Sequence, residues 1–276
     1  MRRLAALAAA ALLASACGGG GTDAEDVLAE TADNLEEIKS GDLSMRLVVT
    51  PKGADAEPFG FELRGPFSLT AGEIPEARIA YTQIRGSERG AVMVISTGGK
   101  AYVEVAGQTY ELPPEEARQL RVAGEELREG EGLGELGLDD WIEDPKLSDG
   151  GTVGGAETDR IDADVNVAAA AHDLVALGRG LAPGSLGRLS DADEQTLERA
   201  TRSAKLQVFS GDEDRLLRRL VIDIDLGFDV PSELRAALGN LVGAQIEFEL
   251  SVADPNEPVT VQKPENVLPH TELPGR

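Results

Sequence analysis

The strongest constraint on the fold is a strict alternation of apolar and polar residues in the last third of the chain. Every second residue from Leu220 to Phe228 is apolar, and Asp223 and Asp225 fall between them. The alternation returns from Ile246 to Val252, where Glu and Ser fill the other positions. Because successive side chains of a strand point to opposite faces, both segments predict strands with one covered face and one wet face.

Shorter apolar runs separated by glycine and proline continue this pattern through the first half of the chain. Gly98-Gly99 between two such runs is typical of a hairpin turn, and 150–155 is a further glycine-rich turn. We expect mostly antiparallel strands, with segments over 43–50, 59–69, 77–84, 91–96, 101–112, 158–165 and, last, 259–262.

Helices are predicted between these strands. Thr22 and Glu25 form a capping box, followed by a helical stripe. Pro114 suits the first turn of a second helix, and Ser190 with Asp193 and Glu194 suits the start of a short one. Further helices are expected over 167–177 and 231–242. Without a repeat or a long linker, the pattern predicts one large α+β domain.

The N-terminal segment carries the pattern of a secretory signal. Arg2 and Arg3 precede a run of Leu and Ala, which is shorter than the roughly 20 residues of a spanning helix. The run ends in small residues before Cys17, and 13–17 resembles a bacterial lipobox with Ala14 in the usual leucine position. We expect residues 1–16 to be removed and Cys17 to be lipidated. Residues 17–22 would then be the lipidated Cys and a glycine-rich tether, residues 23–264 the folded body and residues 265–276 a tail. The protein would then be anchored to the outer face of a membrane.

Composition excludes several classes of function. The chain has 26 Lys and Arg against 50 Asp and Glu, a net charge of -24 that gives no basis for binding nucleic acid. A single Cys and two His leave no disulfide framework and no Cys/His metal cluster, so we expect no cofactor and no metal. The adjacent His172 and Asp173 cannot orient each other on a helix, and no Gly-x-Ser-x-Gly elbow is present. We therefore expect no enzymatic activity.

Two charged segments have simple structural interpretations. The acidic run 162–173 superficially resembles a calcium loop, but Val167 stands where the loop needs glycine and Asp173 replaces the bidentate glutamate. Outward alternation with Asn166 capping the next helix explains it better. The charges over 212–219 are interpreted as solvated turn residues, with partner binding as the alternative.

With the elements laid out in this way, the chain resembles the LppX/LprAFG group of envelope lipoproteins and, more broadly, the LolA/LolB-like lipoprotein-carrier fold. Four segments carry the resemblance: the lipobox with the helix over 22–39, the Trp141 segment leading through Pro145 into 154–158 and 162–167, the charged turn and strand over 212–228, and the hairpin over 253–259 before Lys263-Pro264.

The resemblance implies a strongly curved antiparallel sheet, a half-barrel, that wraps helices and encloses an apolar cavity. Such a cavity would hold a lipid or glycolipid with acyl chains of the length of palmitate, and a sixteen-carbon chain gains roughly 12 kcal/mol on leaving water before ordering costs. The expected lining residues are Phe59, Phe61, Leu63, Val103, Val105, Leu220, Ile222, Ile224, Leu226, Phe228, Ile246, Phe248 and Leu250.

Two alternatives stay open. Alternation alone is equally consistent with these residues closing on the helices as a dry core. The same fold could also serve as an envelope sensor or interaction module that binds a protein partner and no internal ligand.

Overall fold

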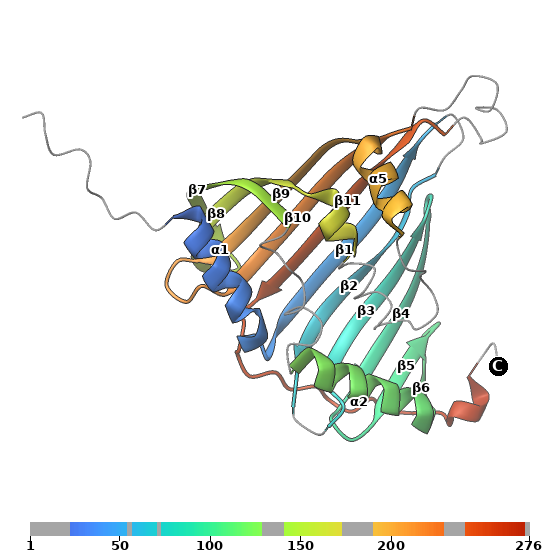
Figure 1. The fold of residues 1–276 in the computed structure, drawn as a ribbon. Helices are drawn as coiled ribbons and strands as arrows, with labels where there is room; N and C mark the ends of the chain where they lie inside the picture. Colours follow the sequence, from blue (N-terminus) through green and yellow to red (C-terminus); the bar gives the residue numbers. More distant parts are fainter. Residues whose placement is uncertain are drawn as a thin grey trace, which may run out of the picture.

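The computed structural model describes residues 23–53, 57–70, 73–128, 141–172, 190–228 and 241–273. Within these residues the strands are β1 (Ser40–Lys52), β2 (Phe59–Ser68), β3 (Glu76–Arg85), β4 (Glu88–Ser96), β5 (Ala101–Val105), β6 (Gln108–Glu111), β7 (Ile142–Val153), β8 (Ala156–Val165), β9 (Thr201–Gly211), β10 (Leu217–Gly227) and β11 (Gly243–Ala253). They form one 11-stranded antiparallel sheet in the order β6-β5-β4-β3-β2-β1-β11-β10-β9-β8-β7 (Figure 1). The predicted α+β class with a large antiparallel sheet is confirmed.

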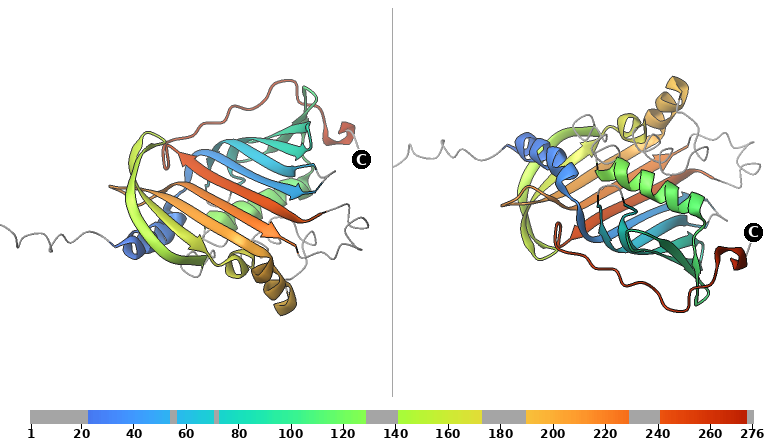
Figure 2. Two further views of the ribbon diagram at one scale, coloured as in Figure 1. Left: turned by 90° about the horizontal axis from the view of Figure 1, so that it is seen from above. Right: turned by 90° about the horizontal axis from the view of Figure 1, so that it is seen from below.

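The strand register sorts apolar and charged residues onto opposite faces. Leu47 of β1 lies between Phe61 of β2 and Phe248 of β11, and Phe248 in turn lies beside Ile222 of β10. These residues define what we call the inner face. Asp223 and other charged residues alternate with them on the outer face. The sheet is strongly bent, and β7 and β8 curl around the first helix (Figure 2).

Glycines and irregular pairing accompany the bend. Gly65 of β2 has φ +140°, and a Cβ there would lie 2.0 Å from the carbonyl oxygen of Arg78. No side chain could occupy this position, where β2 and β3 approach closely. The pairing of β7 with β8 shifts register between Glu143 and Lys146 and again between Asp149 and Gly151. Such bulges increase local twist and bend a strand.

Helix α1 (Ala24–Asp33) continues into a short 3-10 helix (Asn34–Glu37) and packs on one half of the inner face. Its N-cap is Asp23, whose side chain accepts a hydrogen bond from Ala24 N at 2.7 Å, so the predicted N-cap at Thr22 is wrong by one residue. The predicted stripe is confirmed, because all four of its residues are buried: Val27, Thr31, Leu35 and Ile38.

The remaining helices also follow local signals. Helix α2 (Pro114–Arg128) begins at the predicted proline, and α5 (Asp191–Ala200) begins with the predicted capping box of Ser190 and Asp193. Asn166 caps the helical residues 167–172, as predicted, by accepting a hydrogen bond from Ala169 N at 3.1 Å. None of the helices in the described ranges combines the length and hydropathy that crossing a bilayer requires. The helix predicted over 231–242 falls largely outside the described residues.

Several strand predictions need correction. β7 and β9 were not predicted, and the segment predicted as one strand over 101–112 is the hairpin of β5 and β6, turning at Ala106 and Gly107. The strand predicted over 259–262 is wrong, because these residues are extended without a ladder. The chain after β11 instead follows the outer side of the sheet, opposite α2, and joins the β6 edge through a bridge between Leu268 and Tyr110 (Figure 2).

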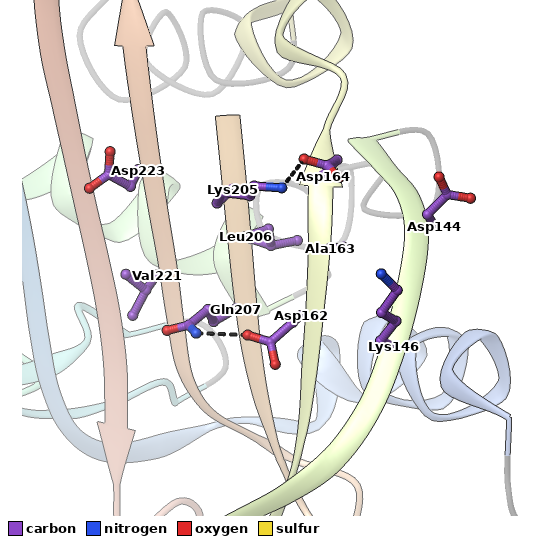
Figure 3. Close-up of a pocket in the computed structure, with 10 residues that line it drawn as sticks. All are labelled: Asp144, Lys146, Asp162, Ala163, Asp164, Lys205, Leu206, Gln207, Val221 and Asp223. Atoms are coloured by element: carbon purple, nitrogen blue, oxygen red, sulfur yellow. Dashed lines mark hydrogen bonds and ion pairs between the residues drawn. The ribbon is translucent and has the colours of Figure 1, made fainter. Parts of the chain in front are cut away.

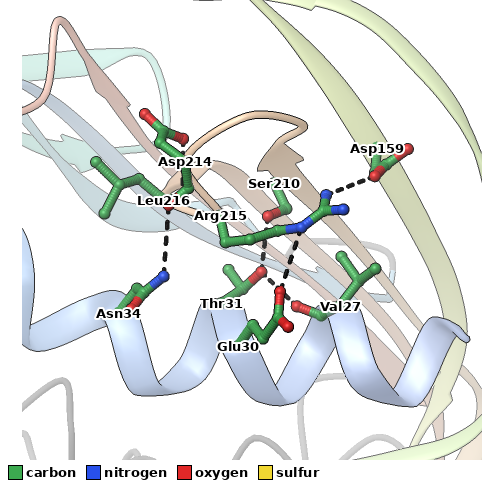
Figure 4. A network of polar contacts seen from close by, with 9 residues as sticks. All are labelled: Val27, Glu30, Thr31, Asn34, Asp159, Ser210, Asp214, Arg215 and Leu216. Atoms are coloured by element: carbon green, nitrogen blue, oxygen red, sulfur yellow. Dashed lines mark hydrogen bonds and ion pairs between the residues drawn. The ribbon is translucent and has the colours of Figure 1, made fainter. Parts of the chain in front are cut away.

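Polar contacts fix α1 to the sheet (Figure 4). The buried hydroxyls of Thr31 on α1 and Ser210 on β9 lie 2.7 Å apart, and Thr31 also donates to the carbonyl oxygen of Val27. Arg215, in the turn after β9, contacts Glu30 of α1 at 3.4 Å and Asp159 of β8 at 2.6 Å. One guanidinium therefore ties the helix, a turn and a strand together.

We predict that Arg215→Gln lowers the free energy of unfolding by about 1–2 kcal/mol, because a largely buried charge-assisted bond to Asp159 is lost. Urea denaturation would measure this change. Arg64→Gln is the matched control, since the Arg64 side chain is 64% exposed beside Glu62 and should cost less than about 0.5 kcal/mol. Equal losses in the two variants would contradict the role of Arg215.

The turn over 212–219 is not merely a group of solvated charges, so that prediction is corrected. Arg218 is only 5% exposed and bonds Asp214 at 2.6 Å. Burial opposes ionisation of Asp214, but the Arg218 guanidinium and the backbone N–H of Leu216 outweigh it and hold the pKa of this carboxyl below its ordinary 3.8. The ionised carboxylate therefore stabilises the folded state.

The sign of this pKa shift gives a pH prediction. A depressed pKa contributes stability that is fully present above the unfolded value near 3.8 and is lost as the pH falls through the folded value. Asp214→Asn should therefore lower stability at pH 7 and lose less further stability on acidification to about pH 3. Urea titrations at both pH values would test this. Asp212→Asn, which removes the same charge from the same turn, should follow the parent's pH dependence.

Candidate functional site

The inner face is divided into a packed half and an open half. On β8, β9 and β10 every inner-face apolar side chain from Ile161 to Leu226 is buried. These side chains pack against α1, Trp141 and the helical residues 167–172. This half is a dry hydrophobic core, as the first of the two alternatives above expects.

The open half lies on β4, β3, β2, β1 and the middle of β11. Most of its inner-face side chains are apolar and only half-buried, although Gln83 and Arg85 of β3 share this face. Together the half-buried apolar side chains form what we call the inner strip: Leu43, Met45, Leu47, Val49, Phe61, Leu63, Phe67, Ile79, Tyr81, Val92, Val94, Ile246 and Phe248. Phe59, the first residue of β2, is 52% exposed beside this strip.

The dimensions of the inner strip follow from sheet geometry. Five neighbouring strands span about 19 Å, and the six-residue step from Phe61 to Phe67 adds about 20 Å in the other direction. Phe61 and Tyr81 stack with ring centroids 6.4 Å apart, which makes part of the strip an aromatic surface. An apolar area of this size offers contact to hydrocarbon.

The thirteen predicted lining residues all fall on the inner face, but they divide between its halves. Six are buried: Val103, Leu220, Ile222, Ile224, Leu226 and Leu250. Six are half-buried: Phe61, Leu63, Val105, Phe228, Ile246 and Phe248. Phe59 is exposed. The structure therefore brings Phe61, Leu63, Ile246 and Phe248 together in the inner strip and places the residues of β10 in the packed half.

Sequence reasoning missed the centre of the inner strip. Met45 and Leu47 of β1 lie between β2 and β11, yet they were not among the expected lining residues. The alternation of Leu43, Met45 and Leu47 with polar residues was a sufficient signal for their face. That β1 lies in the middle of the sheet was not visible, because its partner β11 is about 200 residues away in the sequence.

Apart from the inner strip, a polar depression lies on the outer face of the sheet near β7 (Figure 3). It has a volume of about 350 Å³ and is lined mainly by charged and polar side chains of β7, β8, β9 and β10. Its carboxylates are largely partnered: Asp164 pairs with Lys205, and Asp162 accepts hydrogen bonds from Gln207 at 2.7 Å and Arg160 at 2.8 Å. The depression is therefore lined by polar side chains that are already partnered within β8 and between β8 and β9 on a solvated face.

The polar residues considered for metal or acid–base chemistry do not assemble into a centre. Asp162 and Asp164 lie on one face of β8 in ion pairs, which agrees with the strand interpretation of the calcium-like run. Within the described residues no three His, Cys, Asp or Glu side chains are grouped to hold a metal ion. His172 is exposed, with its Nδ1 3.6 Å from Glu194, and Asp173 lies outside the described residues.

The fold and site define an α+β protein whose single bent antiparallel sheet carries an apolar, partly open inner face. Among solved structures it is similar to LprF from Mycobacterium bovis, with a TM-score of 0.44 and 14% identity over 87% of this chain and 96% of that one. It is also similar to a LolA superfamily protein from Nitrosomonas europaea, with a TM-score of 0.21 and 9% identity over 85% of this chain and 95% of the other.

A DUF1329 family protein from Desulfovibrio piger gives a TM-score of 0.24 and 8% identity over 85% of this chain and 93% of that chain. No family model and no curated protein matches the sequence. LprF and a LolA superfamily protein, which stand for the two groups that the sequence resembles, are among these similar structures. These are distant likenesses of fold, and they do not identify a ligand.

Proposed function

We propose that this protein is a lipid-anchored extracytoplasmic protein that binds a lipophilic molecule on the inner strip. The observation that carries the proposal is the division of the inner face. One half is packed as a core, while the other half is an apolar surface of half-buried side chains. The side chains of this surface that lie next to the core also pack against it: Leu43, Met45, Phe67, Ile246 and Phe248. A contiguous apolar surface that stays partly accessible is a candidate binding site for an apolar partner.

Hydrocarbon is the chemistry that fits the inner strip. Around Leu63 the neighbours Met45 and Tyr81 are also half-buried, so a chain lying there removes further apolar surface from water. A sixteen-carbon chain gains about 12 kcal/mol before ordering costs, at about 0.8 kcal/mol per methylene. Shape and chain length then determine binding, and no reaction is required.

The anchor belongs to the proposal as well. Cys17 follows a signal-like segment and precedes α1 by seven residues. Diacylation of its sulfur would hold the domain at a membrane, since two acyl chains anchor stably where one is marginal. The net charge of -24 would not attract the domain to anionic lipids, so the anchor would act alone.

We predict that Cys17→Ser moves the protein from the membrane fraction to the soluble fraction of its host. Fractionation followed by mass spectrometry of the N-terminal peptide would measure this shift and detect any acylation. Ser15→Ala, which leaves the thiol in place, is the control and should stay with the membrane. Firm membrane attachment of the serine variant would contradict the anchor.

We predict that Leu63→Trp weakens binding of a fluorescent fatty acid about tenfold while leaving thermal stability unchanged. The indole would fill space equal to about two methylenes, or roughly 1.5 kcal/mol of chain burial. Fluorescence titration and thermal unfolding would measure the two effects.

Ile222→Trp in the packed half is the matched control. Overpacking of a dry core should destabilise this variant by about 1–3 kcal/mol. If Leu63→Trp loses comparable stability, then the inner strip is core as well. In that case, or if the parent protein takes up no fatty acid, the lipid-binding proposal fails.

A further inference from the structure

A groove of about 540 Å³ lies beside the first half of α2, at the end of the sheet where β4 turns into β5. Its volume is in the range of small-molecule sites. Ile74, Ala101 and Leu112 give it an apolar component, and charged side chains surround them. The groove is therefore amphipathic, unlike both the inner strip and the outer face.

Positive charge lines the groove on its α2 side. Arg118 and Arg121 stand one turn apart on the helix, and Arg118 bonds Glu115 at 2.7 Å. Arg121 has no ion-pair or hydrogen-bond partner in the described part of the chain. Its charge is therefore available to a ligand.

Negative charge lines the groove beside the β4–β5 turn. The carboxylate of Glu73 lies over Gly98, since a Cβ at that glycine would be 2.5 Å from its Oε2, and Glu76 is also near. Glu73 likewise has no side-chain partner in the described ranges, so it is not bonded to Arg121. Two uncompensated charges of opposite sign thus line one groove without neutralising each other.

The remaining pair in the groove is already neutralised. Lys100 donates to Glu111 at 2.7 Å. This hydrogen bond raises the pKa of Lys100 and lowers that of Glu111, so both side chains stay charged and matched. The charges left for a ligand are one cation on the helix side and one anion on the turn side.

The groove lies close to the inner strip along β5. Ala101 lines the groove, and Val103, two residues further along β5, points to the same inner face. Val103 is paired with Val94 of β4, which belongs to the inner strip. A step of about 7 Å along β5, through buried Ala101 and Val103, and one strand spacing of about 5 Å therefore separate the groove from Val94 of the inner strip.

We propose that this groove is the headgroup site for a zwitterionic amphiphile that carries a phosphate and an amine. The phosphate lies toward Arg121 and Arg118, the ammonium lies toward Glu73, and the acyl chain follows the inner strip. This inference rests on the proposed lipid-binding function. A purely anionic headgroup fits less well, because it would face Glu73 and the field of a chain with a net charge of -24.

The test compares three single-chain amphiphiles with the same acyl group: lysophosphatidylethanolamine, lysophosphatidylglycerol and monoacylglycerol. Each is used to displace a fluorescent fatty acid from the full chain carrying Cys17→Ser. The zwitterionic lipid should displace the probe at the lowest concentration. Arg121→Gln and Glu73→Gln should each reduce its advantage over monoacylglycerol about five- to tenfold and leave monoacylglycerol binding unchanged. Glu73→Lys should shift the preference toward lysophosphatidylglycerol.

Arg89→Gln is the matched control, because Arg89 is an exposed arginine at the start of β4, away from the groove, and should change nothing. Equal displacement by all three lipids, or a headgroup preference that survives both groove substitutions, would overturn the headgroup site and leave lipid binding intact. A preference for the anionic lipid that only Arg121→Gln removes would replace the zwitterion with an anion. Failure of the parent to bind the probe would contradict the proposed function itself.

Discussion

The structure depends on the need of one large sheet to bury its apolar face. An 11-stranded sheet exposes far more inner surface than α1 alone can cover. Bending brings β7 and β8 around α1, so that half of the inner face becomes a core that includes Trp141. The other half remains apolar without being fully covered. The packed core in one half and the partly accessible apolar surface in the other therefore arise from the same arrangement of α1 on the bent sheet.

The polar contacts of α1 determine where this division falls. Arg215 and the Thr31–Ser210 pair hold the helix against β8 and β9, so the helix cannot slide across to β1 and β2 without breaking them. Arg218, a buried arginine at the start of β10, donates a hydrogen bond to Asp214 and so connects this strand to the same turn. Because α1 lies close to Cys17 in sequence, a lipid anchor at that residue would hold the domain through a helix that is itself packed on the sheet.

The sequence predicted which face of the sheet a side chain occupies better than it predicted which strands pair with each other. The alternation in β10 and β11 fixed which residues face inward, and the capping residues Ser190 and Asn166 marked helix starts correctly. β7 escaped prediction because its sequence, with Pro145, Lys146 and paired glycines, has little alternation and is ordered by its neighbour β8. The alternation of Val259 and Val261 predicted a strand, yet these residues lie in an extended tail without a ladder. The inner strip could not be located, because alternation identifies a face and does not show whether another element covers it.

An apolar surface that is only half-buried also links ligand binding to stability. In the packed half, burial is complete without a ligand, so that core sets the stability of the unliganded fold. In the inner strip, burial would be completed only by a bound hydrocarbon, and a ligand that binds the folded state alone would stabilise it by RT ln(1 + [L]/Kd). Because β1 and β11 connect the two halves through long ladders, this stabilisation would reach the whole sheet. Under the proposed function, the half-covered face would therefore link ligand binding to stability without any moving part.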